Sequence, residues 1–234
     1  MELKKIAVIR NGFKDKFGIP RQSGIVEDVI SEIVFEKEYR NDEALRGIEG
    51  YSHLWLLWLF SDNMDESQTN GKFSPTVRPP RLGGNKRMGV FATRSPFRPN
   101  MIGLSSVRLV GTKATKDSGT VLIVSGADIE SGTPVIDIKP YIKFIDSHPD
   151  AVCGFADDHA SYRLKVVCGD EIREKAEKMI IDTIVELIAC DPRPSYQNDP
   201  DRIYIMDYAG YKISFKADDT TATIVGIEYT GEIN

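Results

Sequence analysis

The feature that most constrains the fold is a series of short strand-like runs in the first 148 residues, where helical patterns are few. Turns rich in Gly, Pro or Asp separate these runs, which cover residues 3–10, 51–60, 88–93, 103–110, 120–126 and 135–138. The run at 51–60 is rich in aromatic and aliphatic residues, so we expect a strand there that is buried on both faces. Many short strands with such turns predict a mostly β fold, a largely antiparallel barrel or sandwich.

The pattern changes near residue 149, where a polar stretch at 149–162 is typical of a surface linker. Apolar residues then recur at helical spacing and would share one face of a helix: Ile172, Ala176, Met179, Ile180, Ile184, Leu187 and Ile188. This spacing predicts a single helix over residues 170–190, which Pro192 and Pro194 bring to an end.

Three strand-like runs follow this helix and complete a small α+β unit. The runs at 202–207 and 211–217 flank an Ala-Gly pair, which predicts a hairpin, and residues 223–229 form a third strand. The sequence therefore predicts two domains, a β domain over residues 1–150 and a small α+β domain over residues 160–234.

Missing motifs narrow the classes of function. The chain has no GxGxxG after a strand, no GxxxxGK[ST], no HExxH and no GxSxG, so a Rossmann cofactor site has no support. The three histidines lack metal-ligand spacing, and we expect no metal. One of them, His53, lies in an apolar run and is interpreted as a hydrogen-bonded core histidine, with a place in a site as the alternative. Since no membrane span or signal peptide is evident, we expect a cytoplasmic protein without membrane contact.

Charge is distributed unevenly along the chain, whose net charge is −5. Residues 67–116 contain ten Lys and Arg and no Asp or Glu, whereas the remainder holds 20 basic and 35 acidic residues. The segment therefore carries +10 and the rest −15, which favours a local positive field that attracts an anion or nucleic acid. The alternative is that these cations pair with acidic residues elsewhere in the fold.

Arginines in this segment stand on loops that proline stiffens. Residues 76–89 and 93–103 both combine Arg with Pro and Gly, and the second also offers Asn100 for amide recognition. Proline lowers the conformational freedom of a loop, and the planar guanidinium fork suits carboxylate and phosphate groups. A third cluster at residues 18–24 supplies Arg21 and Gln22. The residues alone thus predict rigid cationic loops facing an anion.

One extended segment places an acid, an amine and a phenol on alternate positions. These are Asp137, Lys139 and Tyr141, whose side chains share one face of a strand. Such a set can transfer a proton or order a polar ligand. A surface charge pair next to a turn fits the spacing equally well, and the reaction type does not follow from it.

Five stretches of the chain closely resemble the TsaA-like family of tRNA methyltransferases. They are PRQSG (20–24), GIEGYSHLWLLWLF (47–60), TVRPPRLGGNKRMGVFATRSPFRPNMIGLS (76–105), SGTPVIDIKPY (131–141) and DPRPSY (191–196). The resemblance implies a β-barrel methyltransferase fold, usually homodimeric, with S-adenosylmethionine as cofactor. It also implies methylation of N6 of threonylcarbamoyl-adenosine, next to the anticodon of certain tRNAs.

The resemblance further assigns roles to individual residues. It implies a cofactor pocket at Gln22, Ser23, Gly24, Phe60, Ser61, Arg94, Leu104, Asp128, Ile129 and Ser131. It implies that tRNA or the threonyl carboxylate is faced by Arg81, Arg87, Arg98, Asn100, Asp191, Arg193 and Tyr196. Asp137 is our hypothesis for the base that removes the N6 proton, with Lys139 and Tyr141 orienting it. Met101 stands where the family pattern leads us to expect proline, which should loosen that turn slightly.

Two other classes of function remain open at this point. One is a non-catalytic RNA-binding module that senses S-adenosylmethionine or a nucleotide, and the other is a hydrolase that binds an anion through its arginines. The Asp137, Lys139 and Tyr141 face favours an enzyme over a sensor. The absence of a nucleophile elbow and of a metal-ligand cluster weighs against the hydrolase.

Overall fold

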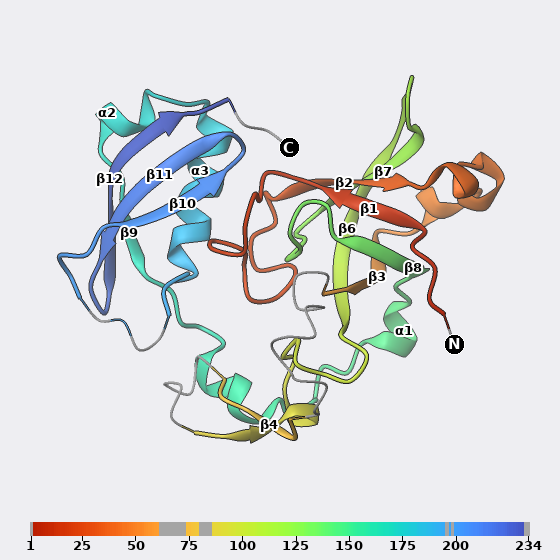
Figure 1. The fold of residues 1–234 in the computed structure, drawn as a ribbon, viewed down its shortest axis with the longest axis horizontal. Coiled ribbons are helices and arrows are strands. Elements are labelled where there is room, and N and C mark those ends of the chain that lie inside the picture. The colour runs from red at the N-terminus through yellow and green to blue at the C-terminus, as the bar shows by residue number, and fades with distance from the viewer. Residues whose placement is uncertain (1, 61–73, 80–85, 195–196, 198, 232–234) are drawn as a thin grey trace.

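Six antiparallel strands close into a barrel in the computed structural model, which describes residues 2–60, 74–79, 86–194, 197 and 199–231 (Figure 1). Around the barrel they follow the order β1-β2-β7-β6-β3-β8. Their bounds are β1 Ala7–Arg10, β2 Ile30–Phe35, β3 His53–Leu59, β6 Ile102–Thr115, β7 Gly119–Ser125 and β8 Pro134–Pro140. The mostly β fold that the turn-separated runs predict is confirmed.

Side chains alternate between the inside and the outside of the barrel, and β3 shows this clearly. Leu54, Leu56 and Trp58 are buried in the barrel core, whereas Trp55 and Leu57 between them are partly exposed. The prediction that this strand is buried on both faces is therefore wrong. An antiparallel sheet can bury one face of a strand and leave the other accessible, so the outer face of β3 is available to line a site.

The run at residues 88–93 does not become a barrel strand. β5 covers only Met88–Gly89 and pairs with β4, Thr76–Val77, in a separate two-stranded sheet. A 3₁₀ segment follows at Val90–Ala92. The Val90 side chain is buried there, and the Val90 backbone N–H donates to the Pro75 carbonyl. Conversely, residues 30–35, to which the sequence pattern assigned no strand, form β2 between β1 and β7.

The C-terminal unit is a four-stranded sheet in the order β10-β11-β12-β9. A short helix, α1 at Lys143–Asp146, follows the barrel before this unit begins. The elements of the unit are β9 Lys165–Val167, α2 Asp170–Arg173, α3 Lys178–Ala189, β10 Tyr204–Tyr208, β11 Tyr211–Ala217 and β12 Thr221–Tyr229. The predicted hairpin and third strand are confirmed. Ala209 and Gly210 both have positive φ, 51° and 80°, as a two-residue hairpin turn requires.

The predicted single helix over residues 170–190 is wrong, because the structure divides it into α2 and α3. Glu177, between them, has an extended backbone (φ −59°, ψ 143°), which resets the helical phase. As a result Ile181, Ile184 and Ile188 face the core, while Met179, expected on that face, is 65% exposed.

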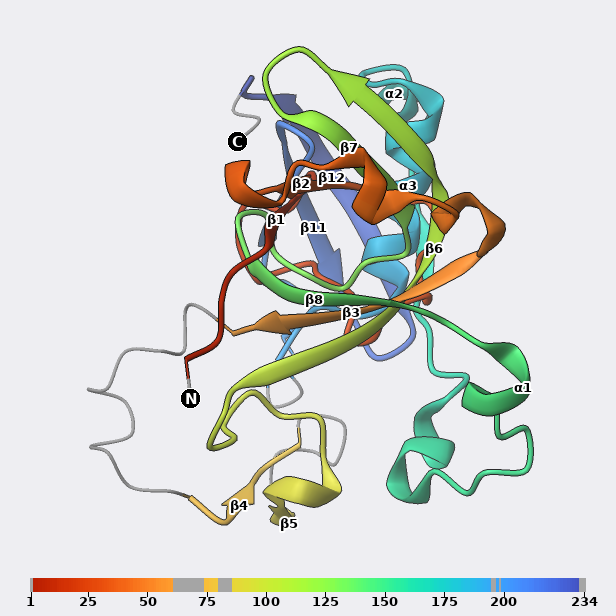
Figure 2. The same ribbon diagram turned by 90° about the vertical axis from the view of Figure 1, so that its right-hand side faces the viewer.

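The barrel and the C-terminal unit share a core through the loop that follows β1. Phe13, Val26 and Val29 are buried among apolar residues of α3, β10, β11 and β12. The backbone joins as well, since Phe13 forms a β-bridge with Tyr208 and the Ala209 N–H donates to the Gly12 carbonyl at 2.8 Å. Figure 1 shows this loop between the barrel and the C-terminal sheet, and Figure 2 shows the barrel in front of that sheet. The segment that carries Arg21 and Gln22 is thereby fixed from both sides.

Candidate active site

The loop at residues 22–24 covers the edge of β6 beyond the point where β7 ends. The pairing of β6 with β7 stops at Arg108 and Ser125, so residues 102–107 have no strand neighbour on that side. The Ser106 N–H instead donates to Ser23 Oγ at 3.1 Å, and the Gly24 N–H donates to the Gly126 carbonyl at 2.8 Å. The cofactor loop implied by the family resemblance therefore lies directly against the barrel wall.

A chain of polar contacts begins inside the barrel and ends at this loop. The Trp58 indole N–H donates to Ser105 Oγ at 3.0 Å, and Ser105 Oγ donates to Asp128 Oδ1 at 2.5 Å. Gly103 is required beneath Trp58, since a Cβ there would lie 2.3 Å from the indole ring. Burial raises the pKa of the Asp128 carboxyl, against the opposing effects of the Ser105 hydrogen bond and the Arg94 charge.

Arg94 connects the proline-rich loop after β5 to the loop at residues 22–24. Its Nη1 donates to Gln22 Oε1 at 2.5 Å. Gln22, Ser23, Gly24, Arg94 and Asp128, five of the implied cofactor residues, are thus brought together from three segments, and we call them the loop cluster.

The other implied cofactor residues lie around this cluster in different environments. The Phe60 ring packs on Trp58 with centroids 4.2 Å apart, and Leu104 is half exposed on the strand that carries Ser105. Ile129 points into the barrel core, whereas Ser131 Oγ accepts a hydrogen bond from the Asn11 N–H at 3.4 Å. Ser61 lies outside the described residues.

A β-bulge turns the Asp137, Lys139 and Tyr141 face outward. Val135 pairs with Trp58 inside the barrel, but the register shifts between Leu57 and Trp58, so Asp137 pairs with Leu57 on the outer face. Lys139 Nζ lies 2.8 Å from Asp137 Oδ2, and the Ile138 N–H donates to Asp137 Oδ1 at 2.9 Å. The Tyr141 ring packs against Trp55, with centroids 5.6 Å apart. The acid and the amine are therefore paired, while the phenol is held by an aromatic neighbour.

Strand register aligns these side chains with those of β6 across the outer face of β3. The three rows are Leu104, Leu57 and Asp137; Ser106, Trp55 and Lys139; and Arg108, His53 and Tyr141. Neighbouring strands lie about 4.8 Å apart, so the Cα atoms of Leu104 and Asp137 are about 10 Å apart. The loop cluster and the Asp137–Lys139 pair thus border one face of the barrel.

The residues assigned to tRNA between β4 and β6 differ in how they are held. Arg98 Nη1 donates to the Thr93 carbonyl at 2.7 Å, and its guanidinium lies over the Phe91 ring. Arg87 Nε donates to Thr76 Oγ1 at 3.0 Å, while Asn100 is exposed. Met101 has a φ of 46°, which the proline ring cannot adopt, so this turn differs from a proline-containing one in geometry as well as stiffness. Arg81 and Tyr196 lie outside the described residues.

Arg193 takes a structural position instead of the tRNA-facing place that the motif implies. Its side chain is only 5% exposed and donates to both carboxylate oxygens of Asp191, at 2.8 and 3.1 Å. It also donates to the carbonyls of Ala217 and Asp218, at 2.9 and 2.7 Å. Four N–H bonds are therefore used inside the C-terminal unit. The pair with Asp191 also raises the pKa of Arg193, and Asp191 accepts a hydrogen bond from Tyr162.

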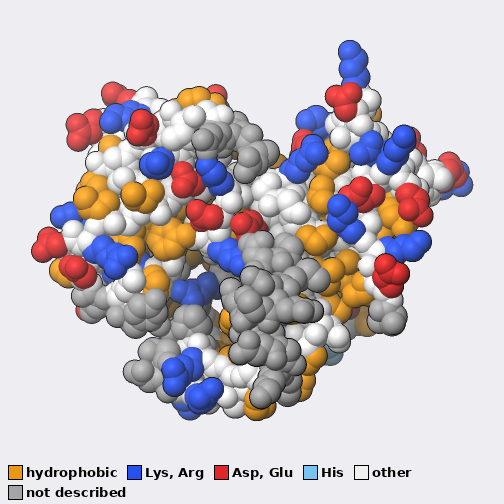
Figure 3. All heavy atoms as spheres, in the orientation of Figure 1, with side chains coloured by type: hydrophobic (Ala, Val, Ile, Leu, Met, Phe, Trp, Pro, Cys, Tyr) orange, Lys and Arg blue, Asp and Glu red, His pale blue; other side chains and the backbone are white. Residues whose placement is uncertain are grey.

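Most described cations of residues 67–116 do not pair with acids. Within the part of this segment that the structure describes, the one ion pair joins Lys113 to Glu32, at 3.0 Å. Arg94 and Arg98 bind uncharged oxygens, and Figure 3 shows Lys and Arg side chains gathered over the segment around β4. The alternative in which these cations are neutralised one by one is not supported by the described residues.

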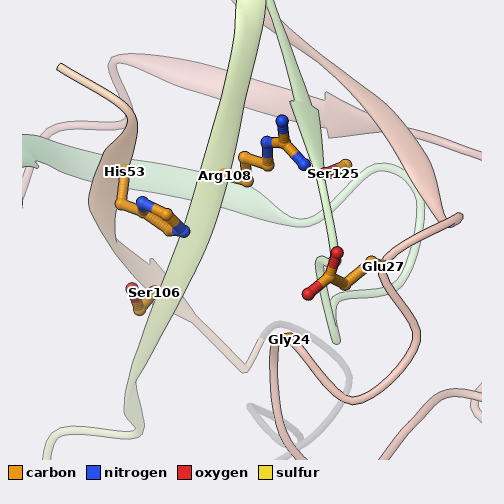
Figure 4. Close-up of a pocket in the computed structure, with 7 residues that line it drawn as sticks. Gly24, Glu27, His53, Ser106, Arg108 and Ser125 are labelled. Atoms are coloured by element: carbon orange, nitrogen blue, oxygen red, sulfur yellow. The ribbon is translucent and has the colours of Figure 1, made fainter.

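An open cavity of about 200 Å³, which the sequence pattern did not indicate, lies next to the loop cluster (Figure 4). We call it the Arg108 pocket, and its lining residues are Gly24, Glu27, His53, Ser106, Arg108, Ser125 and Gly126. His53 is exposed, so its interpretation as a core histidine is wrong, and the alternative place in a site fits its position. The available signal was strand alternation, which puts His53 on the outer face opposite Leu54.

Two structural features are absent from the described residues. Among them, no group of three or more His, Cys, Asp or Glu side chains is arranged to hold a metal ion. No helix in the described ranges combines the length and the apolar character needed to cross a membrane.

Comparison with known proteins gives consistent matches over both parts of the chain. The model of the tRNA-methyltransferase O N-terminal domain matches residues 8–147, and that of the TrmO C-terminal domain matches residues 162–230. The tRNA (adenine(37)-N6)-methyltransferase of Escherichia coli K12 is 38% identical over 97% of both chains. A putative S-adenosylmethionine-dependent methyltransferase, RcsF of Pseudomonas aeruginosa PAO1, is 40% identical over 85% of both. The crystal structure of TrmO from P. aeruginosa matches with a TM-score of 0.77 and 30% identity, covering 98% of this chain and 97% of that one.

Proposed function

Because this chain belongs to the tRNA-methyltransferase O family, we propose that it methylates N6 of threonylcarbamoyl-adenosine next to the anticodon of tRNA. Membership in the family indicates that the protein is a tRNA adenine-N6 methyltransferase that depends on S-adenosylmethionine. The threonylcarbamoyl group on the target base is the part that we propose, and it rests on the TsaA-like motifs. The arginines on fixed loops support it, because this base carries a carboxylate in addition to the tRNA phosphates.

The loop cluster and its surroundings fit the cofactor chemically. Gln22, Arg94 and Asp128 offer donors and acceptors for hydroxyl, amine and carboxylate groups. Phe60 and Leu104 supply an aromatic ring and a half-exposed apolar side chain for a nucleoside. When bound, S-adenosylmethionine supplies a methyl group on a positively charged sulfur. In our proposal these residues hold it beside the outer face of the barrel.

Asp137 is the proposed base. N6 of the substrate belongs to a urea-like group and is a poor nucleophile, so methylation benefits from removal of its proton and from alignment. The Asp137 carboxylate accepts that proton, while Lys139 and the Ile138 N–H fix its orientation through their contacts with the two carboxylate oxygens. Tyr141 is proposed to order the ligand beside them. Arg81, Arg87, Arg98, Asn100, Asp191 and Tyr196 remain predicted contacts of the tRNA.

The alignment of Leu104, Leu57 and Asp137 across β3 is the observation that carries this proposal. It gives the implied cofactor residues and the proposed base access to one bound nucleotide. A sensor needs no proton acceptor at this place, so the alignment favours an enzyme that acts on the nucleotide. Assembly as a homodimer stays a prediction of the family resemblance, and the cytoplasmic location and the two-domain division at residues 1–150 and 160–234 stay predictions of the sequence pattern.

The test compares two tRNAs that differ at one base. The protein and S-adenosylmethionine are incubated with tRNA that bears threonylcarbamoyl-adenosine and with the same tRNA transcribed without modifications. Nucleoside mass spectrometry should find one added methyl on the threonylcarbamoyl base and none on the unmodified adenosine. Equal methylation of the two tRNAs would show that the threonylcarbamoyl group is not required, and the protein would remain a tRNA adenine-N6 methyltransferase.

A further inference from the structure

The Arg108 pocket contains polar groups that the protein itself does not use. Among the described residues, neither the Arg108 guanidinium nor the hydroxyls of Ser106 and Ser125 have a hydrogen-bond partner. By contrast, Arg98 in the neighbouring loop uses its guanidinium on backbone carbonyls. Arg108 is exposed and these groups line a concave site, so a ligand bound there can reach them.

Charge at the pocket is arranged as two opposed poles. Arg108 and His53 lie on neighbouring strands in the same row, and Glu27 comes from the loop on the other side (Figure 4). Glu27 and Arg108 do not form an ion pair within 4.0 Å, so both heads remain accessible. His53 Nδ1 lies 2.9 Å from Ser52 Oγ, which leaves Nε2 for another contact. The pocket therefore suits a small group with a carboxylate at one end and a hydrogen-bond donor at the other.

We propose that the Arg108 pocket binds the threonyl end of the substrate base, an inference that rests on the proposed function. Arg108 pairs with the threonyl carboxylate through its planar fork, and His53 and the Ser106 and Ser125 hydroxyls complete the donors. Glu27 accepts a hydrogen bond from the threonine hydroxyl. Arg108 and His53 are thus specificity-determining residues, which distinguish the threonylcarbamoyl base from plain adenosine.

The position of the pocket favours the substrate over the methionyl end of the cofactor, which also carries a carboxylate. Arg108 and His53 share the outer barrel face with Asp137 and stand in the same row as Tyr141. Arg108 is four residues from Leu104 along β6, or about 13 Å. In the proposed binding mode, the Arg108 side chain and the threonylcarbamoyl group together span this distance. A base with N6 near the loop cluster therefore reaches the pocket with its carboxylate.

The first test uses Arg108→Gln, with Lys116→Gln as the matched control. Lys116 is exposed in the turn between β6 and β7, and its replacement removes the same charge. Each protein receives tRNA with threonylcarbamoyl-adenosine, and the same tRNA whose threonyl carboxyl group has been converted to the carboxamide. Arg108→Gln should lower kcat/KM about 10- to 100-fold on the carboxylate substrate and leave the carboxamide substrate within about twofold. Arg108→Lys keeps the charge without the planar fork. Its kcat/KM on the carboxylate substrate should therefore lie between that of the wild type and that of Arg108→Gln. Equal losses on both substrates would overturn the assignment.

A second test separates the possible sources of the carboxylate. Calorimetry with S-adenosylmethionine alone should give the same Kd for wild type and Arg108→Gln, and a tenfold weaker Kd would assign the pocket to the cofactor and overturn the proposal. The free nucleoside threonylcarbamoyl-adenosine should bind the wild type more tightly than it binds Arg108→Gln, and equal affinities would contradict it. These binding experiments do not need turnover. Failure of the wild type to methylate the modified tRNA would therefore count against the proposed function separately.

Discussion

Two arginines with a proline within two residues, Arg94 in the loop before β6 and Arg193 in the DPRP segment, look alike in the sequence and differ in the structure. Arg193 is 5% exposed and donates to a carboxylate and two backbone carbonyls within its own unit. Arg94 is exposed and donates to the Gln22 side chain of a different segment. The first arginine closes the C-terminal fold, and the second joins two loops at an accessible surface.

The role of each arginine depends more on the carbonyl groups around its side chain than on the sequence motif that contains it. Where carbonyls converge, as around Arg193, four of the five donors are used and the side chain is fixed inside the protein. Where a strand edge and two loops meet, as around Arg94 and Arg108, the guanidinium remains available to a ligand.

The largest effect is expected for Arg193→Ala. The change leaves Asp191, which is 14% exposed, without its cation and two carbonyls without donors. Breaking a buried pair in this way costs about 3–5 kcal/mol in the free energy of unfolding. Urea denaturation should show this loss, while Arg94→Ala should stay within about 1 kcal/mol of the wild type because that side chain is exposed. Similar losses for the two variants would contradict the comparison.

Asp137→Asn should affect turnover and leave binding unchanged. The amide keeps the shape of the side chain but accepts protons poorly, so kcat should fall about 100-fold or more if Asp137 is the base. Single-turnover methylation measures the loss, and calorimetry should give an unchanged Kd for S-adenosylmethionine. Asp117→Asn, in the exposed β6–β7 turn, is the control and should keep full activity. A kcat within threefold of the wild type would rule out Asp137 as base.

Arg94→Ala should weaken cofactor binding about tenfold, since one charge-assisted contact is lost. Calorimetry with S-adenosylmethionine measures this change without tRNA. The matched control is Arg87→Ala, because Arg87 bonds to Thr76 away from the loop cluster and should leave the cofactor Kd unchanged. Equal Kd values for the two variants would show that Arg94 does not take part in cofactor binding.

The smallest effect is expected for Asp128→Asn, on stability against pH. Burial raises the pKa of Asp128 above its ordinary value of 3.8, so the folded state disfavours ionisation of this carboxyl. That cost is absent below the unfolded pKa and grows as the pH rises through the folded pKa. Thermal unfolding should therefore give a higher Tm for Asp128→Asn at pH 7 and the same Tm as the wild type near pH 3. A lower Tm at pH 7 would show that the hydrogen bond from Ser105 and the Arg94 charge outweigh burial.

The sequence predicted the parts of the molecule that depend on local patterns. Alternating runs gave the positions of β3, β6, β7, β8 and the C-terminal hairpin, because side-chain period and turn residues act over a few positions. The break at Glu177 and the buried place of Arg193 depend on contacts with distant segments, which a single sequence does not reveal. The Arg108 pocket belongs to the same class, since strand register brings His53 and Arg108 together from positions 55 residues apart. The shared face of Asp137 and Lys139, by contrast, was predicted from spacing alone, although the bulge that turns this face outward was not.

In our proposal, the loop cluster and Asp137 serve one bound nucleotide on the outer barrel face. A crystal structure of the protein with S-adenosylmethionine tests it most directly. We predict that the cofactor contacts Gln22, Arg94 and Asp128 and directs its methyl group toward the face that carries Asp137. Cofactor bound at the C-terminal sheet, or with its methyl group turned away from that face, would contradict the claim.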